Sequence, residues 1–186
     1  MIETALVSCD DHLDLNMLPA NVWTDRLGAK WGDRAPRIVE QESGPALWMA
    51  DGQSWGFWSG KPMGFSGPKP IHTAYDRGGI EDLTELRAGN PNLRLHDRDR
   101  YSVWARVVVG LVLSITTSDE AFMKACYAAY NDWLYEEFCP IAPDRLIGVA
   151  MLPPHPEAAL EELQRLAALG SCKQANLQIA ICEPRP

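Results

Sequence analysis

The sequence has few cysteines and no closely spaced pair of them. The five are Cys9, Cys126, Cys139, Cys172 and Cys182, and none belongs to a Cys-x-x-Cys motif. An odd number at irregular spacing argues against a disulfide framework and against a structural zinc site built from cysteine pairs. We therefore expect free thiols, most of them buried, in a protein of the reducing cytoplasm.

Long apolar runs and basic clusters are also missing. No segment approaches the roughly 20 apolar residues of a membrane span, and the N-terminus lacks the basic flank and apolar stretch of a secretory signal. With 25 acidic and 17 basic residues, the net charge is −8. Nucleic acids and anionic membranes bind clustered Lys and Arg, so we expect neither as a partner. The stretch from Arg94 to Arg106 is basic, but acidic residues interrupt it, and it is predicted to be a solvated loop.

Several common catalytic motifs are absent as well. The chain has no Gly-x-Gly-x-x-Gly fingerprint, no phosphate-binding loop and no nucleophile elbow. These motifs are typical of dinucleotide binding, nucleotide hydrolysis and Ser-His-Asp catalysis. Nothing specific in the sequence favours these three functions.

Four apolar runs rich in strand formers are present instead. The first ends abruptly at Asp10 and Asp11, as a buried strand does when its end opens into a polar site. The runs cover residues 4–9, 103–114, 145–153 and 173–181. Helical spacing of apolar residues separates the last three runs. Strands that alternate with helices predict a parallel sheet with right-handed crossovers.

Two helices are predicted between these strands. The first covers residues 119–138, and Thr117 and Glu120 have the spacing of a capping box at its start. The second has Pro156 near its first position and Gly170 as its stop. Its apolar face is predicted to contain Leu160, Leu163 and Leu166.

The segment from Pro19 to Arg100 has a different composition. It holds most of the Gly and Pro residues and five of the seven tryptophans, namely Trp23, Trp31, Trp48, Trp55 and Trp58. A structureless loop of this length is rare in a compact domain. We predict an ordered insertion, residues 19–100, with a small aromatic core and a hairpin whose turn is Asp51–Gly52.

The motif Asp10-x-His12 is the sharpest candidate site. Residues two apart in an extended strand point to the same face, so a carboxylate and an imidazole could reach one ion. This donor set suits Zn²⁺ or a similar divalent metal. The alternative is a turn in which Asp10 or Asp11 caps the next segment and His12 is only polar. Asp14 continues the alternation, but we expect it to be a loop residue.

The other histidines have simpler interpretations. His72 lies among Gly and Pro residues and is expected in a loop. His96 lies among charged residues and is expected to be exposed, and His155, between two prolines, is expected at a helix entry. None of them has a spacing typical of a metal site.

Four stretches together resemble the amidohydrolase-related family that includes the aminocarboxymuconate-semialdehyde and γ-resorcylate decarboxylases. They are VSCDDHLDLN (7–16), DRDRYSVWARV (97–107), ACYAAYNDWL (125–134) and APDRLIGVAMLP (142–153). The strings YNDWL and APDRLIG are the most specific. The resemblance implies a (β/α)₈ TIM barrel with a divalent metal at the C-terminal ends of its strands. It also implies that Asp10 and His12 are metal ligands, with Zn²⁺ as the expected ion and Mn²⁺ as the alternative.

The chain departs from this family in two ways. The usual Glu three residues after the histidine is Leu15 here. A complete barrel needs about 250 residues, whereas this chain has 186 and supplies roughly the first four strands. Family members add a His from a middle strand and an Asp from a late strand, and neither has a counterpart here. We therefore expect a single incomplete α/β barrel domain, residues 1–186, that is a fragment or a natural truncation.

Two functions remain open from the sequence. The first is the N-terminal portion of a metal-dependent enzyme that hydrolyses or decarboxylates a small carboxylated or amide-type substrate. The second is a catalytically incomplete half-barrel that acts by self-association or with a partner chain, and a homo-oligomer is expected. A weaker third interpretation is an apolar-ligand-binding protein that uses the Trp-rich segment. Residues that would discriminate hydrolysis from decarboxylation would lie on strands that are absent.

Overall fold

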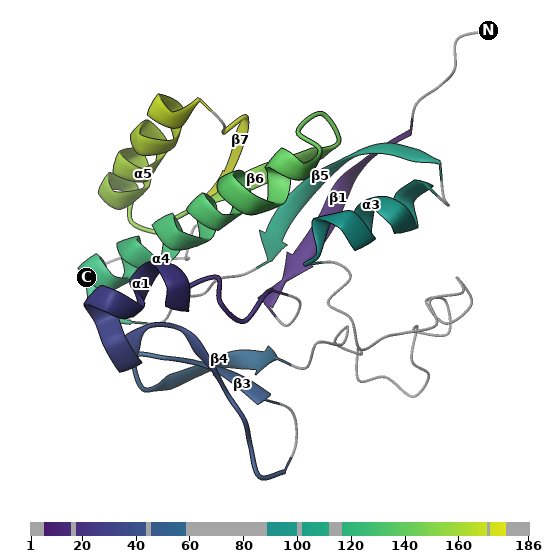
Figure 1. Ribbon diagram of the computed structural model, residues 1–186. Coiled ribbons are helices and arrows are strands. Elements are labelled where there is room, and N and C mark those ends of the chain that lie inside the picture. The colour runs from purple at the N-terminus through teal and green to yellow at the C-terminus, as the bar shows by residue number, and fades with distance from the viewer. Residues whose placement is uncertain are drawn as a thin grey trace, which may run out of the picture.

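The computed structural model describes residues 6–15, 18–43, 46–58, 89–99, 102–111, 117–170 and 172–177. Its main feature is a curled sheet of four parallel strands in the order β1-β5-β6-β7 (Figure 1). The strands are β1 (Leu6–Asp14), β5 (Val103–Leu111), β6 (Leu146–Leu152) and β7 (Gln174–Leu177). The predicted α/β class and parallel strand order are confirmed, and the sheet is compatible with part of a barrel.

Three helices connect the successive parallel strands. They are α3 (Pro91–Asp99), α4 (Glu120–Trp133) and α5 (Pro156–Leu169). The helix α4 continues into a π-helical turn, η3 (Leu134–Phe138), and a 3₁₀ turn, η4 (Cys139–Ile141). The strand–helix alternation is the physical reason for the parallel sheet, because each helix returns the chain to the same end of the next strand.

The helix α3 corrects the prediction of a solvated loop between Arg94 and Arg106. Arg94 lies in α3 with only 6% of its surface exposed, and Arg106 lies inside β5. Leu95 packs against the main core. A charged segment can be helical and half-buried when its apolar positions and side-chain stems pack on a sheet.

The register of the sheet separates its two faces. Asp11, Val108 and Gly148 form one row across β1, β5 and β6. A Cβ on Gly148 would lie 2.7 Å from Cys139 Sγ and 2.9 Å from Leu134, so this row faces the helical layer. The neighbouring row of His12, Val109 and Val149 therefore lies on the opposite face.

A bulge in β1 interrupts the strict alternation. Ser8 pairs with Arg106 and Asp11 pairs with Val108, so β1 has one more residue than β5 over this interval. Such a bulge keeps Ser8 and Asp11 on the helical face and leaves Asp10 between them. Strand β1 also runs to Asp14, beyond the predicted end at residue 9, because its pairing with β5 continues past the acidic pair. Asp14 is thus the last strand residue, where a loop residue was expected.

The segment after β1 forms a smaller Trp-rich unit that shares the main core. It contains α1 (Thr24–Trp31), a 3₁₀ turn η2 (Gly32–Arg34) and an antiparallel sheet of β2 (Arg37–Val39), β3 (Ala46–Ala50) and β4 (Gln53–Trp58). The predicted turn is confirmed, since Asp51 and Gly52 have φ angles of 50° and 76°. The predicted aromatic contacts are present in the described part: the rings of Trp23 and Trp48 meet edge to face at 4.9 Å, and Trp23 and Trp55 at 6.1 Å. They do not form a separate core, because Trp23 and Trp48 belong to the same buried cluster as residues of α4.

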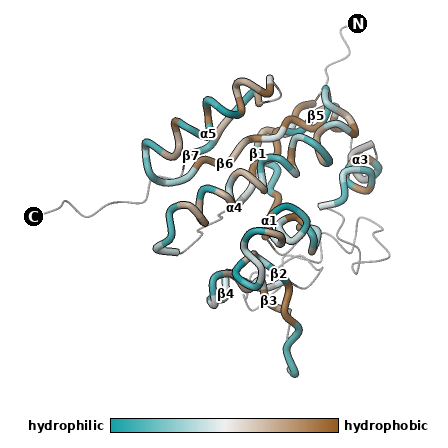
Figure 2. The backbone as a smooth tube through the Cα atoms, turned by 60° about the vertical axis from the view of Figure 1, so that its left-hand side comes forward, coloured by the Kyte–Doolittle hydropathy of each residue, from teal (hydrophilic) through white to brown (hydrophobic). Residues whose placement is uncertain are grey.

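Two helix details differ from the prediction. The N-cap of α4 is Asp119, whose carboxylate accepts a hydrogen bond from the Phe122 N–H at 3.0 Å, and not Thr117. In α5 the predicted apolar face is wrong: Leu166 is buried, but Leu160 and Leu163 are 56% and 41% exposed. Figure 2 shows hydrophilic and hydrophobic residues alternating along the turns of α5. The prediction of Pro156 at its start and left-handed Gly170 at its end is confirmed.

Candidate functional site

Asp10 and His12 lie together on β1. His12 Nε2 is 3.0 Å from Asp10 Oδ1, and the two side chains are 45% and 87% exposed, His12 first. The pair lies within the strand, two to four residues before its C-terminal end, whereas the sequence placed it at that end. Both side chains belong to the face away from the helical layer. The sequence prediction that they share one face is consistent with this geometry.

Asp11, between them, has a different role. Its Oδ2 lies 2.8 Å from Arg106 Nη1, and its Oδ1 accepts a hydrogen bond of 2.7 Å from the Ser8 hydroxyl. Both side chains of this ion pair are largely buried, at 13% and 20% exposure. Asp11 therefore ties β1 to β5 on the packed face, and the alternative that it caps a following segment is wrong.

Arg94 reaches the same stretch from the crossover helix α3. Its Nη2 donates a hydrogen bond of 2.6 Å to the main-chain carbonyl of His12. Its guanidinium carbon also lies 5.9 Å from the centre of the Phe138 ring. Neither Arg94 nor Arg106 was singled out by sequence reasoning, because a lone arginine in a charged segment has no spacing signal.

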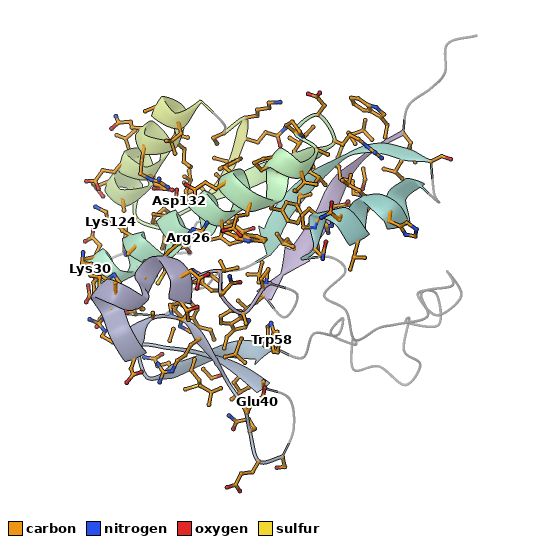
Figure 3. All side chains as sticks on the ribbon, viewed as in Figure 1. Arg26, Lys30, Glu40, Trp58, Lys124 and Asp132 are labelled. Carbon is orange, nitrogen blue, oxygen red and sulfur yellow. The ribbon has the colours of Figure 1, made fainter. Side chains whose placement is uncertain are left out.

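The Trp-rich unit is fastened directly after β1. Trp48 Nε1 donates to the carbonyl of Leu15, and Trp58 Nε1 donates to the carbonyl of Leu18, both at 2.8 Å. Figure 3 shows Trp58 at the end of β4, on the side of the small sheet that faces the parallel sheet. The small sheet thus adjoins the end of the strand that carries Asp10 and His12.

The described residues offer no third ligand beside this pair. Within the described ranges, no group of three His, Cys, Asp or Glu side chains is arranged to hold a metal ion. His96 and His155 are exposed, and His155 is the N-cap residue of α5, as its helix-entry prediction requires. His72 and Cys182 lie outside the described residues.

Two cavities occur elsewhere. One of about 290 Å³ lies at the start of β6, where Leu146 and Gly148 line it together with Tyr135, Cys139 and Lys173. The other, of about 360 Å³, lies at the start of α3 against Trp133 and Phe138. Neither is lined by Asp10 or His12, so the open face of β1 and not an enclosed pocket is the candidate site.

The buried thiols are poor nucleophiles. Burial raises the pKa of Cys139 to about 11 and holds the pKa of Cys126 well above its ordinary value. A thiol must ionise to attack a substrate, so neither supports a cysteine-dependent reaction at neutral pH. Of the other described cysteines, Cys172 is half-buried and Cys9 is exposed.

The chain is similar in structure to an amidohydrolase from Mycobacterium avium subsp. paratuberculosis K-10. That crystal structure matches with a TM-score of 0.65 and 17% sequence identity, over 94% of this chain and 50% of the other. The chain thus spans about half the length of this solved structure. No model of a known protein family matches the chain, and no curated protein matches it. At this identity the likeness shows an amidohydrolase-like fold. It does not extend to the specific decarboxylase family that the sequence resembles.

The helices also bear on the expectation that no segment spans a membrane. Among the described residues, every helix is too short or too polar to cross a membrane.

Proposed function

We propose that the chain supplies one half-barrel of a metal-dependent amidohydrolase-type enzyme, with Asp10 and His12 as two ligands of a divalent metal ion. Zn²⁺ is the expected ion and Mn²⁺ the alternative. The observation that carries the proposal is the pairing of these two side chains on the face of β1 that points away from the helices. In closed parallel barrels this face lines the interior, and active sites occupy the C-terminal strand ends.

The donor set and its spacing fit a metal ion. Two ligands about 2.1 Å from one ion lie about 3.4 Å apart at the tetrahedral angle that Zn²⁺ prefers and about 3.0 Å apart at an octahedral angle. His12 Nε2 and Asp10 Oδ1 are 3.0 Å apart. An imidazole nitrogen with a carboxylate oxygen is a donor pair that Zn²⁺ and Mn²⁺ both accept. Two donors do not complete a site, so the remaining ligands must come from outside the described residues.

The bound ion would supply Lewis-acid chemistry, polarising a carbonyl or carboxylate or lowering the pKa of a water molecule. The residues of this chain hold the ligands. Asp10 Oδ1 and His12 Nε2 are the two facing donor atoms, and an ion bound by both would replace the contact between them. Asp11 and Arg106 join the strand beneath them to β5.

The substrate class follows from the family resemblance alone. A small carboxylated or amide-type substrate is proposed, with hydrolysis or non-oxidative decarboxylation as the reaction. The Trp-rich unit adjoins the end of β1 through Trp48 and Trp58, and this position would let it border a bound substrate. Nothing in the described residues separates the two reactions.

Metal titration of the purified chain tests the proposal. We expect Co²⁺ or Zn²⁺ to bind the wild type at one site and to bind neither Asp10→Ala nor His12→Ala at that site. Matched controls are Asp33→Ala and His155→Ala, two exposed positions away from the sheet face. Binding that all four variants retain, or no bound metal in any oligomeric form, would refute the proposal for this chain.

A second candidate is a half-barrel that acts through association alone. The observation in its favour is the set of exposed apolar side chains near both edge strands, among them Leu6, Val7 and Leu177. Stable self-association in a protein that binds no metal would favour this function over the first.

A further inference from the structure

We propose that Arg94 is a positioning residue that holds the metal-ligating stretch Asp10–His12 from the packed side of the sheet. Arg106 supports the same stretch through its ion pair with Asp11. The proposal rests on the proposed function, since it concerns the same two ligands. Arg94 bonds a main-chain carbonyl and Arg106 pairs with Asp11, so each is proposed to act through the strand and not on a substrate.

The need for such support follows from the exposure of the ligands. The Asp10 side chain is 87% exposed and the His12 side chain 45% exposed. Strand β1 also has a single strand neighbour, β5, in the described sheet. Packing on the open face therefore contributes little to holding the two side chains, and their geometry depends on how firmly the main chain beneath them is fixed.

Arg94 fixes that main chain at the ligand itself. Its Nη2 donates to the His12 carbonyl at 2.6 Å, across 82 residues of sequence. Arg94 is 6% exposed, and a buried guanidinium is costly unless its charge is compensated by hydrogen bonds and neighbours. A charge-assisted hydrogen bond of this kind is about twice as strong as a neutral one. The bond joins the crossover helix α3 to the one residue of β1 whose imidazole is proposed to bind metal.

Arg106 fixes the adjacent residue. The Arg106–Asp11 ion pair, at 2.8 Å, lies on the opposite face of β1 from Asp10 and His12. Successive side chains of a strand alternate in direction. An Asp11 side chain that is held on the packed face therefore keeps the side chains of its neighbours, Asp10 and His12, on the open face. The bulge at Cys9 and Asp10 would otherwise be the point at which the strand can twist. The two arginines together hold the two residues that follow this bulge.

The experiment compares Arg94→Met and Arg94→Lys with the wild type. The matched control is Arg165→Met, since Arg165 is a partly buried arginine that pairs with Glu162 within α5 and joins α5 to α4 through Asp132. The first readout is the ¹⁵N spectrum of the His12 imidazole in the metal-free protein, assigned with His12→Gln. The second is the Co²⁺ dissociation constant. Circular dichroism shows which variants are folded.

We expect Arg94→Met to mix the two imidazole tautomers of His12 and to weaken Co²⁺ binding about tenfold or more, the range seen when a group that orients a ligand is lost. Arg94→Lys should recover part of both effects, since lysine keeps one donor but not the fork geometry. Arg165→Met should lower the unfolding midpoint and leave the His12 spectrum and the dissociation constant unchanged.

Wild-type values for both readouts in folded Arg94→Met would overturn the proposal. If that variant fails to fold, Arg94→Lys decides in the same way. If the wild type binds no Co²⁺, the proposed function fails, and the His12 spectrum alone then decides whether Arg94 positions this side chain.

Discussion

A close contact with Tyr130 leaves no room for a side chain at Gly110, near the end of β5. Gly110 lies under the buried ring of Tyr130, and a Cβ there would come 2.9 Å from Tyr130 Cζ and closer still to the hydroxyl. The Tyr130 hydroxyl is fully buried with no hydrogen-bond partner in the described residues, and burial raises the pKa of Tyr130 well above its ordinary value. The hydroxyl therefore costs desolvation without compensation, and it occupies the space that a side chain at Gly110 would need.

We predict that Gly110→Ala lowers the free energy of unfolding by about 1–3 kcal/mol, the usual cost of overpacking a core. The control is Gly28→Ala in helix α1, where nothing lies within 4 Å of the new Cβ. That change should be neutral or raise stability by up to about 1 kcal/mol. Adding Tyr130→Phe to Gly110→Ala should recover part of the loss. Urea unfolding measures all three, and a Gly110→Ala variant as stable as the wild type would contradict the contact.

At the scale of elements, Arg34 connects the Trp-rich unit to α4. Its Nε lies 2.7 Å from Asp51 in the β3–β4 turn, and its Nη2 lies 2.9 Å from Asp119, the N-cap of α4. The Arg34 hydrogen bond is the main cause that lowers the pKa of Asp51, with Thr117 second. The pKa of Asp119 is lowered first by the Phe122 N–H and then by Arg34.

These lowered pKa values predict a pH dependence. A carboxyl whose pKa is lower in the folded state stabilises the fold above its unfolded pKa, about 3.9, and that stability is lost as the pH falls through the folded value. The difference in unfolding midpoint between wild type and Arg34→Gln should thus be constant from about pH 7 to about pH 5 and shrink below about pH 4. Arg37→Gln, with an exposed partner in Asp33, is the control. A difference in unfolding midpoint that stays constant down to about pH 2 would show that Arg34 does not stabilise the fold through Asp51 and Asp119.

Periodicity and turn chemistry predicted the elements whose causes are local. The parallel strands and the Asp51–Gly52 hairpin follow from alternation and from a turn that needs positive φ. The errors have tertiary causes. Strand β1 continues past Asp11 because Arg106, 95 positions along the chain, pairs with that carboxylate. For the candidate site, sequence spacing found Asp10 and His12, whereas Arg94 acts through a main-chain carbonyl and leaves no pattern to detect.

At the scale of the molecule, the parallel sheet has two edges, and apolar side chains are exposed beside each of them. Helix α5 buries Ala158, Ala159, Glu162 and Leu166 against the sheet side. Its other apolar residues, Leu160, Leu163 and Leu169, are 56%, 41% and 59% exposed. At the other edge, Leu6 and Val7 of β1 are 56% and 41% exposed. The four parallel strands of the described residues are half of the eight that close a barrel, so two copies of the chain together would have eight.

We therefore predict a concentration-dependent dimer in which the exposed leucines of α5 are covered. Sedimentation velocity of the wild type should show the dimer at micromolar concentration, and Leu160→Gln with Leu163→Gln should shift it to monomer, because burying each leucine contributes about 1.5–3 kcal/mol. Ile141→Gln is the control, since Ile141 is 48% exposed but lies in η4, away from both edge strands. A wild type that stays monomeric at every concentration, or a double variant that dimerises as strongly as Ile141→Gln, would show that α5 is not the contact. The dimer would also bring two Asp10–His12 pairs into one assembly. Metal binding that appears only in the dimer would then show that the proposed metal site depends on the proposed self-association.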